Sequence, residues 1–299
     1  MALTPVLILA LNPSIDAEWR VDDVRWEEKN SVQSERRWVG GKGINVARWF
    51  RHLGGKPRLI LPLGGKTGDE LAGCLRGEKL SGQIIPLREP TRVNVIVTTR
   101  AGRQMRFNPA GPKLSRAEWS RVMKTIRQAL SPSALLVLAG SLPRGVPVDA
   151  YAQLIRLAHE HGARTLLDCD GPAFAEAVKE KPFLVKPNEH ELAQWKDTAL
   201  STESDVLRAA RALSEATRGW VLVSRGAKRG LLVNVREDFQ KFIRPPAVKP
   251  VNTVGAGDAL LAAVTRQVQL GESPENWLAA GLRTGSAATQ LAEIGRAHV

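Results

Sequence analysis

A glycine-rich turn leads directly into an apolar helical run near the end of the chain: Val251-Asn-Thr-Val-Gly-Ala-Gly-Asp258, then Ala259-Leu-Leu-Ala-Ala-Val264. Glycines placed here leave bare backbone N–H groups at a helix start, where the helix dipole and the unpaired amides favour an anion. Gly255 and Gly257 permit the backbone angles and close approach that such a site needs. Asp258 either satisfies the helix dipole or, beside a bound phosphate, accepts a proton from an attacking hydroxyl. The turn therefore predicts a phosphate site with Asp258 as a candidate base.

A second glycine cluster, Val39-Gly-Gly-Lys-Gly-Ile-Asn-Val-Ala-Arg48, opens an amphipathic helix that ends near Gly54. It is not a Walker A loop, because Lys42 is followed by Gly43 and the GxxxxGK[ST] spacing is absent. Two interpretations stay open for it: a tight strand-to-helix connection, or a second site that holds a polar ligand.

A third candidate is Lys186-Pro-Asn-Glu-His-Glu191, directly after a short apolar stretch. Asn188 and Glu191 are three residues apart, so both lie on one face at a helix start. Such a carboxylate and amide suit Mg²⁺-bound waters or phosphate oxygens, because Mg²⁺ keeps most of its waters. A plain helix N-cap by Asn188 is the competing interpretation.

Apolar strands alternate with amphipathic helices over most of the chain, which predicts a parallel sheet covered by helices on both faces. The expected strands are Val6–Leu11, Arg58–Leu63, Ala134–Ala139, Arg164–Asp168, Phe183–Lys186 and Trp220–Ser224. Helical periodicity is clearest in Val148–His161 and Ser204–Arg218.

Hairpin-like segments break this alternation at residues 17–39 and 93–107. We expect them to form a small separate sheet, a lid, beside a single main domain that accounts for residues 1–299. A third hairpin is predicted from Gly230–Val235 and Phe239–Arg244. The fold class is therefore α/β, a doubly wound, mostly parallel sheet flanked by helices, with a small β-sheet lid.

Composition sets limits on function. The chain of 299 residues is 43% hydrophobic and 24% charged, and it has no apolar stretch of about 20 residues that could span a bilayer. Its net charge of +13 favours either nucleic acid or small polyanionic ligands. Because Lys and Arg are scattered and often lie beside acidic residues, we expect no nucleic acid partner and no membrane partner. Two cysteines outside any CxxC pattern make a reducing cytoplasm the expected setting.

Seven motifs together resemble the ribokinase-like (PfkB) carbohydrate kinases, and within them the 1-phosphofructokinase and tagatose-6-phosphate kinase branch. In chain order the motifs are Leu11-Asn-Pro-Ser-Ile-Asp16, Gly40–Arg48, Thr91-Arg-Val-Asn94, Gly140-Ser-Leu-Pro-Arg-Gly-Val-Pro147, Lys186-Pro-Asn-Glu189, Ser224-Arg-Gly-Ala227 and Val251–Asp258. The resemblance implies an ATP-dependent, Mg²⁺-requiring kinase that phosphorylates a phosphosugar.

The resemblance also implies a role for each matched position. Asp258 would be the catalytic base, and the amides of Gly255, Ala256 and Gly257 would form the anion hole. Sugar hydroxyls would be held by Asp16, Gly40, Gly41, Lys42, Gly43 and Asn45. The substrate's own phosphate would meet Arg92, Lys42 and Ser141, with Lys29 or Arg106. Nucleotide would contact Lys186, Asn188, Ser224, Gly226 and Asn252, and Mg²⁺ would be managed through water by Asn188 and Glu191.

Departures from the branch bear on the substrate. The segment Met105-Arg-Phe-Asn-Pro-Ala-Gly-Pro112 has a basic Arg106 and lacks an acidic residue that branch members often carry. Arg106 and Lys29 instead resemble minor 6-phosphofructokinases, and Asp168-Cys-Asp-Gly171 is unusual after its strand. Fructose 1-phosphate is the preferred substrate, tagatose 6-phosphate and fructose 6-phosphate are the alternatives, and a non-catalytic sugar-phosphate sensor is the alternative of a different class. The family lid often pairs with that of another subunit, which implies a homodimer.

Overall fold

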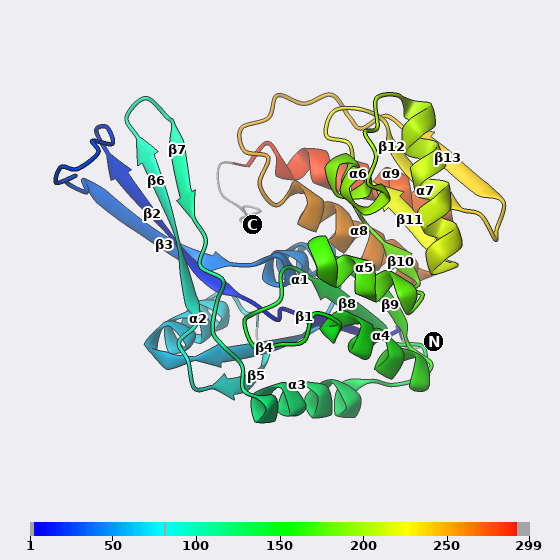
Figure 1. Ribbon diagram of the computed structural model, residues 1–299, viewed down its shortest axis with the longest axis horizontal. Coiled ribbons are helices and arrows are strands. Elements are labelled where there is room, and N and C mark those ends of the chain that lie inside the picture. Colours follow the sequence, from blue (N-terminus) through cyan, green and yellow to red (C-terminus); the bar gives the residue numbers. More distant parts are fainter. Residues whose placement is uncertain (1–2, 81, 292–299) are drawn as a thin grey trace.

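The computed structural model describes residues 3–80 and 82–291, which form one nine-stranded and one four-stranded sheet (Figure 1). The order of the large sheet is β13-β12-β11-β10-β9-β8-β1-β4-β5, and that of the small sheet is β3-β2-β6-β7. The strands of the large sheet are β1 (Val6–Leu9), β4 (Pro57–Gly64), β5 (Gly82–Leu87), β8 (Leu135–Ala139), β9 (Arg164–Asp168), β10 (Leu184–Val185), β11 (Trp220–Val223), β12 (Gly230–Asn234) and β13 (Phe239–Ile243). Those of the small sheet are β2 (Ser14–Val21), β3 (Ser34–Gly40), β6 (Arg92–Thr99) and β7 (Gln104–Phe107).

Nine helices are present in the described residues: α1 (Lys42–His52), α2 (Gly65–Gly77), α3 (Arg116–Ala129), α4 (Ala150–Glu160), α5 (Gly171–Lys179), α6 (Glu189–Lys196), α7 (Glu203–Thr217), α8 (Ala256–Leu270) and α9 (Pro274–Ala288). Capping boxes begin three of them, α3 at Ser115, α6 at Asn188 and α7 at Thr202. Ser273 is the N-cap of α9 without a side-chain cap bond, so Pro274 at the first position is the clearer start signal. Among these residues we find no helix of the length and apolarity that a bilayer crossing requires.

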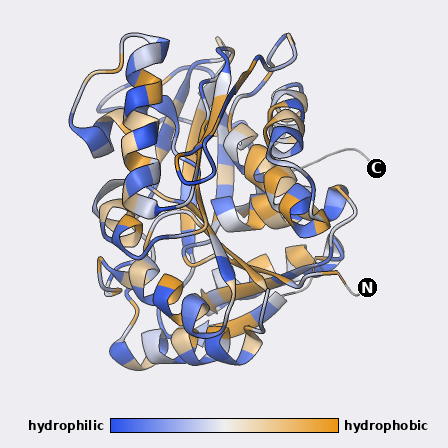
Figure 2. Cartoon of the chain, turned by 90° about the vertical axis from the view of Figure 1, so that its right-hand side faces the viewer, coloured by the Kyte–Doolittle hydropathy of each residue, from blue (hydrophilic) through white to orange (hydrophobic). Residues whose placement is uncertain are grey.

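Helices cover both faces of the large sheet, and Figure 2 shows its apolar strands between them. Successive residues of a strand point to opposite faces, so β1 contributes to two cores. Leu7 and Leu9 pack with α3, α4, α5 and α7, whereas Val6 and Ile8 pack with α1, α2, α8 and α9. This double burial explains why the strands are continuous apolar runs.

The predicted parallel sheet with helices on both faces is confirmed, and so is the antiparallel hairpin of β12 and β13 at its edge. Strand β5 was not predicted. It contains Pro86 and several exposed residues, as an edge strand can, and so lacks the apolar run that marks the central strands. The expected strand Phe183–Lys186 is only two residues long, Leu184–Val185.

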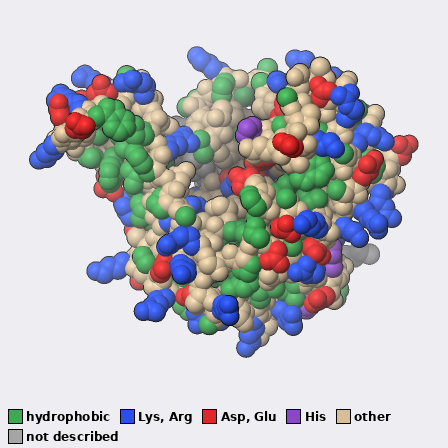
Figure 3. Space-filling view, in the orientation of Figure 1, with side chains coloured by type: hydrophobic (Ala, Val, Ile, Leu, Met, Phe, Trp, Pro, Cys, Tyr) green, Lys and Arg blue, Asp and Glu red, His purple; other side chains and the backbone are tan. Residues whose placement is uncertain are grey.

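The small sheet joins the two segments that break the helix–strand alternation, because β2 pairs with β6 in parallel. Its two faces differ in chemistry. Glu18, Arg20 and Arg106 lie on the face that lines a cleft. The alternate residues Trp19, Val97 and Phe107 lie on the other face, as the period of two requires. Hydrophobic side chains gather on this small sheet in Figure 3.

The order of strands in the large sheet changes direction at β1. The chain adds β4 and then β5 on one side of β1, and β8, β9, β10 and β11 on the other. Ligands of doubly wound sheets bind outside the carboxyl ends of the strands at such a switch point. The topology therefore places a site where β1 and β8 end, beneath the small sheet.

Candidate active site

Polar residues follow the carboxyl ends of five neighbouring strands of the large sheet. Asn12 comes after β1, Ser141 after β8, Lys186 after β10 and Ser224 after β11, and Asp168 is the last residue of β9. Parallel strands bring these ends to one edge, where the molecular surface is hollowed between the small sheet and the main body (Figure 3).

A cleft of about 620 Å³ lies against the polar face of the small sheet. Asp16 lines it, and Oδ1 of Asp16 accepts hydrogen bonds from Ser14 Oγ and from Asn94 Nδ2, each at 2.8 Å. A Cβ atom at Gly40 would lie 2.3 Å from Asp16 Oδ2, so a side chain at this position would displace the carboxylate. Asp16 and Gly40, both predicted to contact the sugar, are thus held together by packing.

A second pocket of about 270 Å³ shares Asn108 with this cleft and lies at the ends of β1 and β8, so we call it the deeper pocket. Its lining includes Gly41, Lys42, Gly43, Arg92 and Ser141. The structure therefore brings together Lys42, Arg92 and Ser141, three of the residues predicted for the substrate's phosphate. Arg92 donates from Nη1 to the Pro109 carbonyl and from Nη2 to the Asn12 carbonyl, both at 2.9 Å. Burial lowers the pKa of Arg92, and the Asp16 carboxylate partly opposes that effect.

Asn12 and Asn94 lie within predicted motifs but were given no role. Asn12 Nδ2 donates to Ser141 Oγ at 3.1 Å, and Asn94 Nδ2 donates to Asp16. In the described part of the chain, Oδ1 of both asparagines is buried without a hydrogen-bond partner, as are Trp38 Nε1 and Arg92 Nε. Buried polar groups are usually paired, so these atoms are candidates to bind the acceptor. Their presence inside the motifs was the signal that could have identified them.

Asp258 lies at the third position of α8, and only 5% of its surface is exposed. Its Oδ2 accepts a hydrogen bond of 2.9 Å from Asn45 Nδ2, so Asn45 contacts the candidate base directly. Gly255, the N-cap, has a left-handed φ of 80°, which glycine adopts without strain. Burial, and next the Asp168 carboxylate, raise the pKa of Asp258 to about 7, against the opposing hydrogen bond from Asn45.

Asp168 lies behind this group and was not predicted as a site residue. Lys42 Nζ is 3.0 Å from its Oδ1, and Lys186 Nζ is 2.9 Å from its Oδ2. Burial raises the pKa of Asp168, but Lys186 and Lys42 outweigh it, so the pKa lies below its usual value. Lys42 and Lys186, predicted to bind different ligands, therefore meet at one carboxylate.

A largely apolar pocket of about 500 Å³ lies beside the glycine-rich turn, and we call it the nucleotide pocket because residues predicted for a nucleotide line it. Its lining includes Ser224 and Gly226, as predicted for a nucleotide, and also Ala256 and Gly257 of the glycine-rich turn. Pro245, Pro246, Val248, Leu260 and Leu282 supply apolar surface suited to a planar base. Asn252 does not line this pocket; it lines the cleft against the small sheet, which we call the acceptor cleft because the residues predicted for the sugar include its Asp16.

Two other predicted residues belong to the small sheet and to its β2–β3 loop. Arg106 lines the acceptor cleft, and its Nη2 donates to Gln104 Oε1 at 2.9 Å. Lys29 lies exposed in the loop between β2 and β3, and it does not line the cleft in the described part of the chain. Lys29 is therefore not brought to the other predicted substrate residues.

Asn188 and Glu191 form the capping box of α6. Asn188 Oδ1 accepts from the Glu191 amide, and Glu191 Oε2 accepts from the Asn188 amide, both at 2.8 Å. The described residues hold no group of three or more His, Cys, Asp or Glu side chains able to bind a metal. Mg²⁺ is commonly bound by one or two carboxylates together with nucleotide phosphates and water, and the second carboxylate oxygen of Glu191 fits that arrangement.

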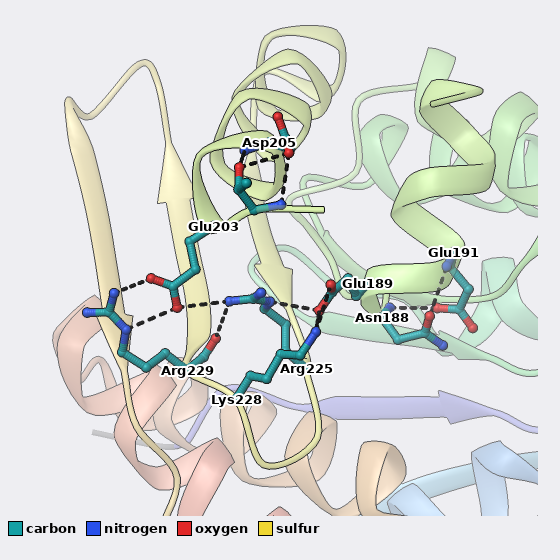
Figure 4. A network of polar contacts seen from close by, with 9 residues as sticks. Asn188, Glu189, Glu191, Glu203, Asp205, Arg225, Lys228 and Arg229 are labelled. Atoms are coloured by element: carbon teal, nitrogen blue, oxygen red, sulfur yellow. Dashed lines mark hydrogen bonds and ion pairs between the residues drawn. The ribbon is translucent and has the colours of Figure 1, made fainter. Parts of the chain in front are cut away.

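A network of charges ties this capping box to the nucleotide loop (Figure 4). Arg225, whose side chain is 4% exposed, donates to Glu189 Oε2 at 2.9 Å and to Glu203 Oε1 at 3.1 Å. Lys228 contacts Glu189, and Arg229 contacts Glu203. The Glu189 amide also donates to the Ser224 carbonyl at 3.1 Å. The network therefore joins the first residues of α6 and α7 to the loop that lines the nucleotide pocket.

Comparison with known proteins gives one family. The model of the pfkB family carbohydrate kinases matches residues 10–295. The chain is 34% identical over 287 residues to ATP-dependent 6-phosphofructokinase isozyme 2 of Escherichia coli (strain K12), covering 95% of this chain and 92% of the relative. It is 31% identical over 294 residues to 1-phosphofructokinase of Bacillus subtilis (strain 168), covering 97% and 94%.

A solved structure extends this likeness to the fold. The phosphofructokinase-2 from Escherichia coli in complex with fructose-6-phosphate matches with a TM-score of 0.89 at 33% identity, over 96% of this chain and 94% of that chain. The predicted ribokinase-like α/β fold with a separate small sheet is thereby confirmed.

Proposed function

The chain belongs to the pfkB family of carbohydrate kinases and is a phosphosugar kinase; on that premise we propose that it phosphorylates fructose 1-phosphate to fructose 1,6-bisphosphate with ATP. The observation that carries the proposed mechanism is the position of Asp258. Its carboxylate is buried at the start of α8, between the Asn45 amide on the acceptor side and the glycine turn that borders the nucleotide pocket.

The reaction needs positioning and charge neutralisation more than covalent chemistry. The acceptor hydroxyl oxygen bonds to the γ-phosphorus while the bond from that phosphorus to the β,γ-bridging oxygen breaks, and ADP leaves. Asp258 takes the hydroxyl proton. The amides of Gly255, Ala256 and Gly257 stabilise the charge on the transferring group, as donors at a helix start do. A base with a pKa near 7 suits this role, because about half of it is ionised at neutral pH and the ionised form accepts a proton readily.

Mg²⁺ supplies charge neutralisation to the β- and γ-phosphates when it binds with ATP. Asn188 and Glu191 would hold it through water. Lys42, Arg92 and Ser141 are proposed to hold the phosphate that the sugar already carries, because they converge on the deeper pocket beside Asp16. The resemblance of the seven motifs together to the 1-phosphofructokinase and tagatose-6-phosphate kinase branch supports fructose 1-phosphate.

Fructose 6-phosphate is the second candidate, and a specific observation favours it. Arg20 and Arg106 line the acceptor cleft but not the deeper pocket, so the cleft offers a second cationic surface to a phosphate. The two candidates differ in which end of the sugar meets Asp258.

ADP release with Mg²⁺ and ATP tests the substrate, measured against fructose 1-phosphate, fructose 6-phosphate, tagatose 6-phosphate, fructose and ribose. We expect the highest kcat/KM with fructose 1-phosphate. A higher value with fructose 6-phosphate or tagatose 6-phosphate would reassign the acceptor. Binding of a phosphosugar by calorimetry without turnover of any would overturn the kinase mechanism and favour a sugar-phosphate sensor.

A homodimer through the lid is proposed from the outer face of the small sheet. Trp19 pairs with Val97, and Val97 pairs with Met105; Phe107, which pairs with Val95, lies on the same face and is 52% exposed. Exposed apolar patches of this kind mark interaction surfaces, and the same face on a second copy is self-complementary. Light scattering at micromolar concentration should give a dimer, and Val97→Glu a monomer. A wild-type monomer, with and without substrate, would contradict the pairing.

A further inference from the structure

The segment Asp168-Cys-Asp-Gly171 contains a charge that the reaction described above does not use. Asp168 ends β9 with 2% of its surface exposed, and each of its carboxylate oxygens contacts a different lysine. Lys42 is the first residue of α1 in the acceptor turn, and Lys186 follows β10 just before the capping box of α6. One carboxylate thus connects two segments that are 144 residues apart in sequence, from residue 42 to residue 186.

The placement of the two ammonium groups points to more than a structural ion pair. A Cβ atom at Gly257 would lie 3.4 Å from Lys186 Nζ, so this ammonium lies beside the anion turn. Lys42 lines the deeper pocket that adjoins the acceptor cleft. The two lysines with one aspartate carry a net positive charge between the two pockets, where the transferring phosphoryl group would pass. Apolar packing of similar volume is often as stable as a buried ion pair, so stability alone gives no reason for such a cluster.

We propose that Asp168 is a positioning residue for phosphoryl transfer, fixing Lys42 toward the acceptor and Lys186 toward the phosphates of ATP through its two carboxylate oxygens. This inference rests on the proposed kinase function. Asp168 is not among the residues that line the nucleotide pocket or the deeper pocket, so it acts through the two lysines.

Asp168 also acts on the base by its charge. The charged groups that face Asp258 are Asp168, Lys42 and Lys186, and Asn45 donates a hydrogen bond to it. The Asp168 carboxylate raises the pKa of Asp258, whereas Lys42 and Lys186 lower it. Replacing Asp168 with a neutral residue of the same shape removes the only one of these charges that raises the pKa. The pKa of Asp258 should then fall, so that the base stays ionised to lower pH.

The test is Asp168→Asn, with Asp238→Asn as the matched control at the exposed turn between β12 and β13, where Asp238 has a left-handed φ that Asn also adopts. For Asp168→Asn we expect kcat to fall about 10- to 100-fold and the acid limb of kcat/KM to move to lower pH by about one unit. The control should keep the wild-type kcat and acid limb. Circular dichroism and active-site titration give the folded fraction.

Asp168→Glu keeps the charge and moves it by one methylene. It should keep the acid limb near its wild-type pH but lose kcat, and it keeps the inference testable where Asp168→Asn fails to fold. An unshifted acid limb in Asp168→Asn, or kcat losses that match the unfolded fraction in both variants, would reduce Asp168 to a structural role. Wild-type kcat in either folded variant would overturn the inference and leave the proposed function intact. Absence of phosphosugar turnover by the wild type would instead overturn the proposed function, and this inference with it.

Discussion

The group around Asp258 and the polar face of the small sheet are both proposed to serve the transfer reaction, but they are built differently. Around Asp258 the polar groups are paired and, apart from the partly exposed Lys42, buried: Asn45 contacts the base, and Asp168 contacts two lysines. On the small sheet, Arg20 and Arg106 border an open cleft and are exposed. The difference indicates that the groups proposed for phosphoryl transfer are held in place by contacts within the chain, whereas Arg20 and Arg106 of the small sheet face solvent.

The most severe way to break the preassembled group is Asp258→Asn. The variant keeps the shape and the hydrogen-bonding capacity toward Asn45 but cannot accept the acceptor's proton, so kcat should fall about 1000-fold or more. KM for both substrates should change by less than about threefold. Asp238→Asn is the control for the chemical change. Retention of more than a tenth of wild-type kcat would remove Asp258 from the role of base.

The pH dependence of kcat/KM examines the same group without a mutation. With the pKa of Asp258 at about 7, the base is protonated below that pH, so kcat/KM should fall about tenfold per pH unit on the acid side. The same pKa affects stability, because the carboxyl group of Asp258 has a pKa of about 7 in the folded protein and its usual value near 4 in the unfolded chain. Tighter proton binding in the folded protein stabilises it at low pH, and this stabilisation is lost as pH rises from about 4 through 7. Asp258→Asn removes the ionisation, so denaturant titration should show a gain in stability relative to wild type that grows from pH 4 to pH 8. An acid limb near pH 4 would contradict the buried, Asp168-coupled environment.

Much of the main sheet could be predicted from sequence because its strands are buried on both faces. The runs Ala134–Ala139 and Arg164–Asp168 have no polar interruption at their centres, and both are strands within one residue of the predicted bounds. Strand β5 and the one-sided small sheet were harder, because their exposed residues weaken any apolar pattern. The two lid segments pair through the parallel strands β2 and β6. This contact joins residues far apart in the sequence, so no local pattern predicts it.

The residues of the site likewise differ in whether local sequence patterns could predict them. The glycines and Asp258 follow from local chemistry, since a helix start with bare amides is visible in the sequence. Asp168 could not be found in this way, because its function depends on Lys42 and Lys186, which come from distant segments. Asn45 was predicted to hold the sugar. Its contact with Asp258 could not be predicted, because it depends on the packing of α1 against α8.

The network on the nucleotide side gives a third, intermediate case, because Arg225 is buried but its acidic partners are partly exposed. Arg225→Gln should raise KM for ATP about tenfold and leave KM for the phosphosugar within about twofold, because the loop of Ser224 and Gly226 loses its anchor to α6. Loss of this buried charge should lower the unfolding free energy by about 1–3 kcal/mol.

Arg225→Lys keeps the charge and should recover part of the ATP affinity, since it loses the fork that reaches two carboxylates. Arg208→Gln, on the exposed face of α7, is the control for removing a surface arginine. Equal changes of both KM values in Arg225→Gln would show a general loss of structure in place of an anchored nucleotide loop.

The smallest effect is expected on the small sheet, at Arg106. Its guanidinium is exposed at the cleft, so water and salt screen its attraction for a phosphate. Arg106→Gln should lower kcat/KM for the accepted phosphosugar about three- to tenfold, leave KM for ATP unchanged, and lose most of this effect at 0.5 M salt. Arg103→Gln removes an equally exposed arginine at the β6–β7 turn that does not line the cleft, and it should match the wild type. A larger loss with fructose 6-phosphate than with fructose 1-phosphate would place the 6-phosphate against the lid. Equal losses with both phosphosugars, or a loss with unphosphorylated fructose, would show that Arg106 contributes only a nonspecific positive charge. The deeper pocket alone would then select the phosphate.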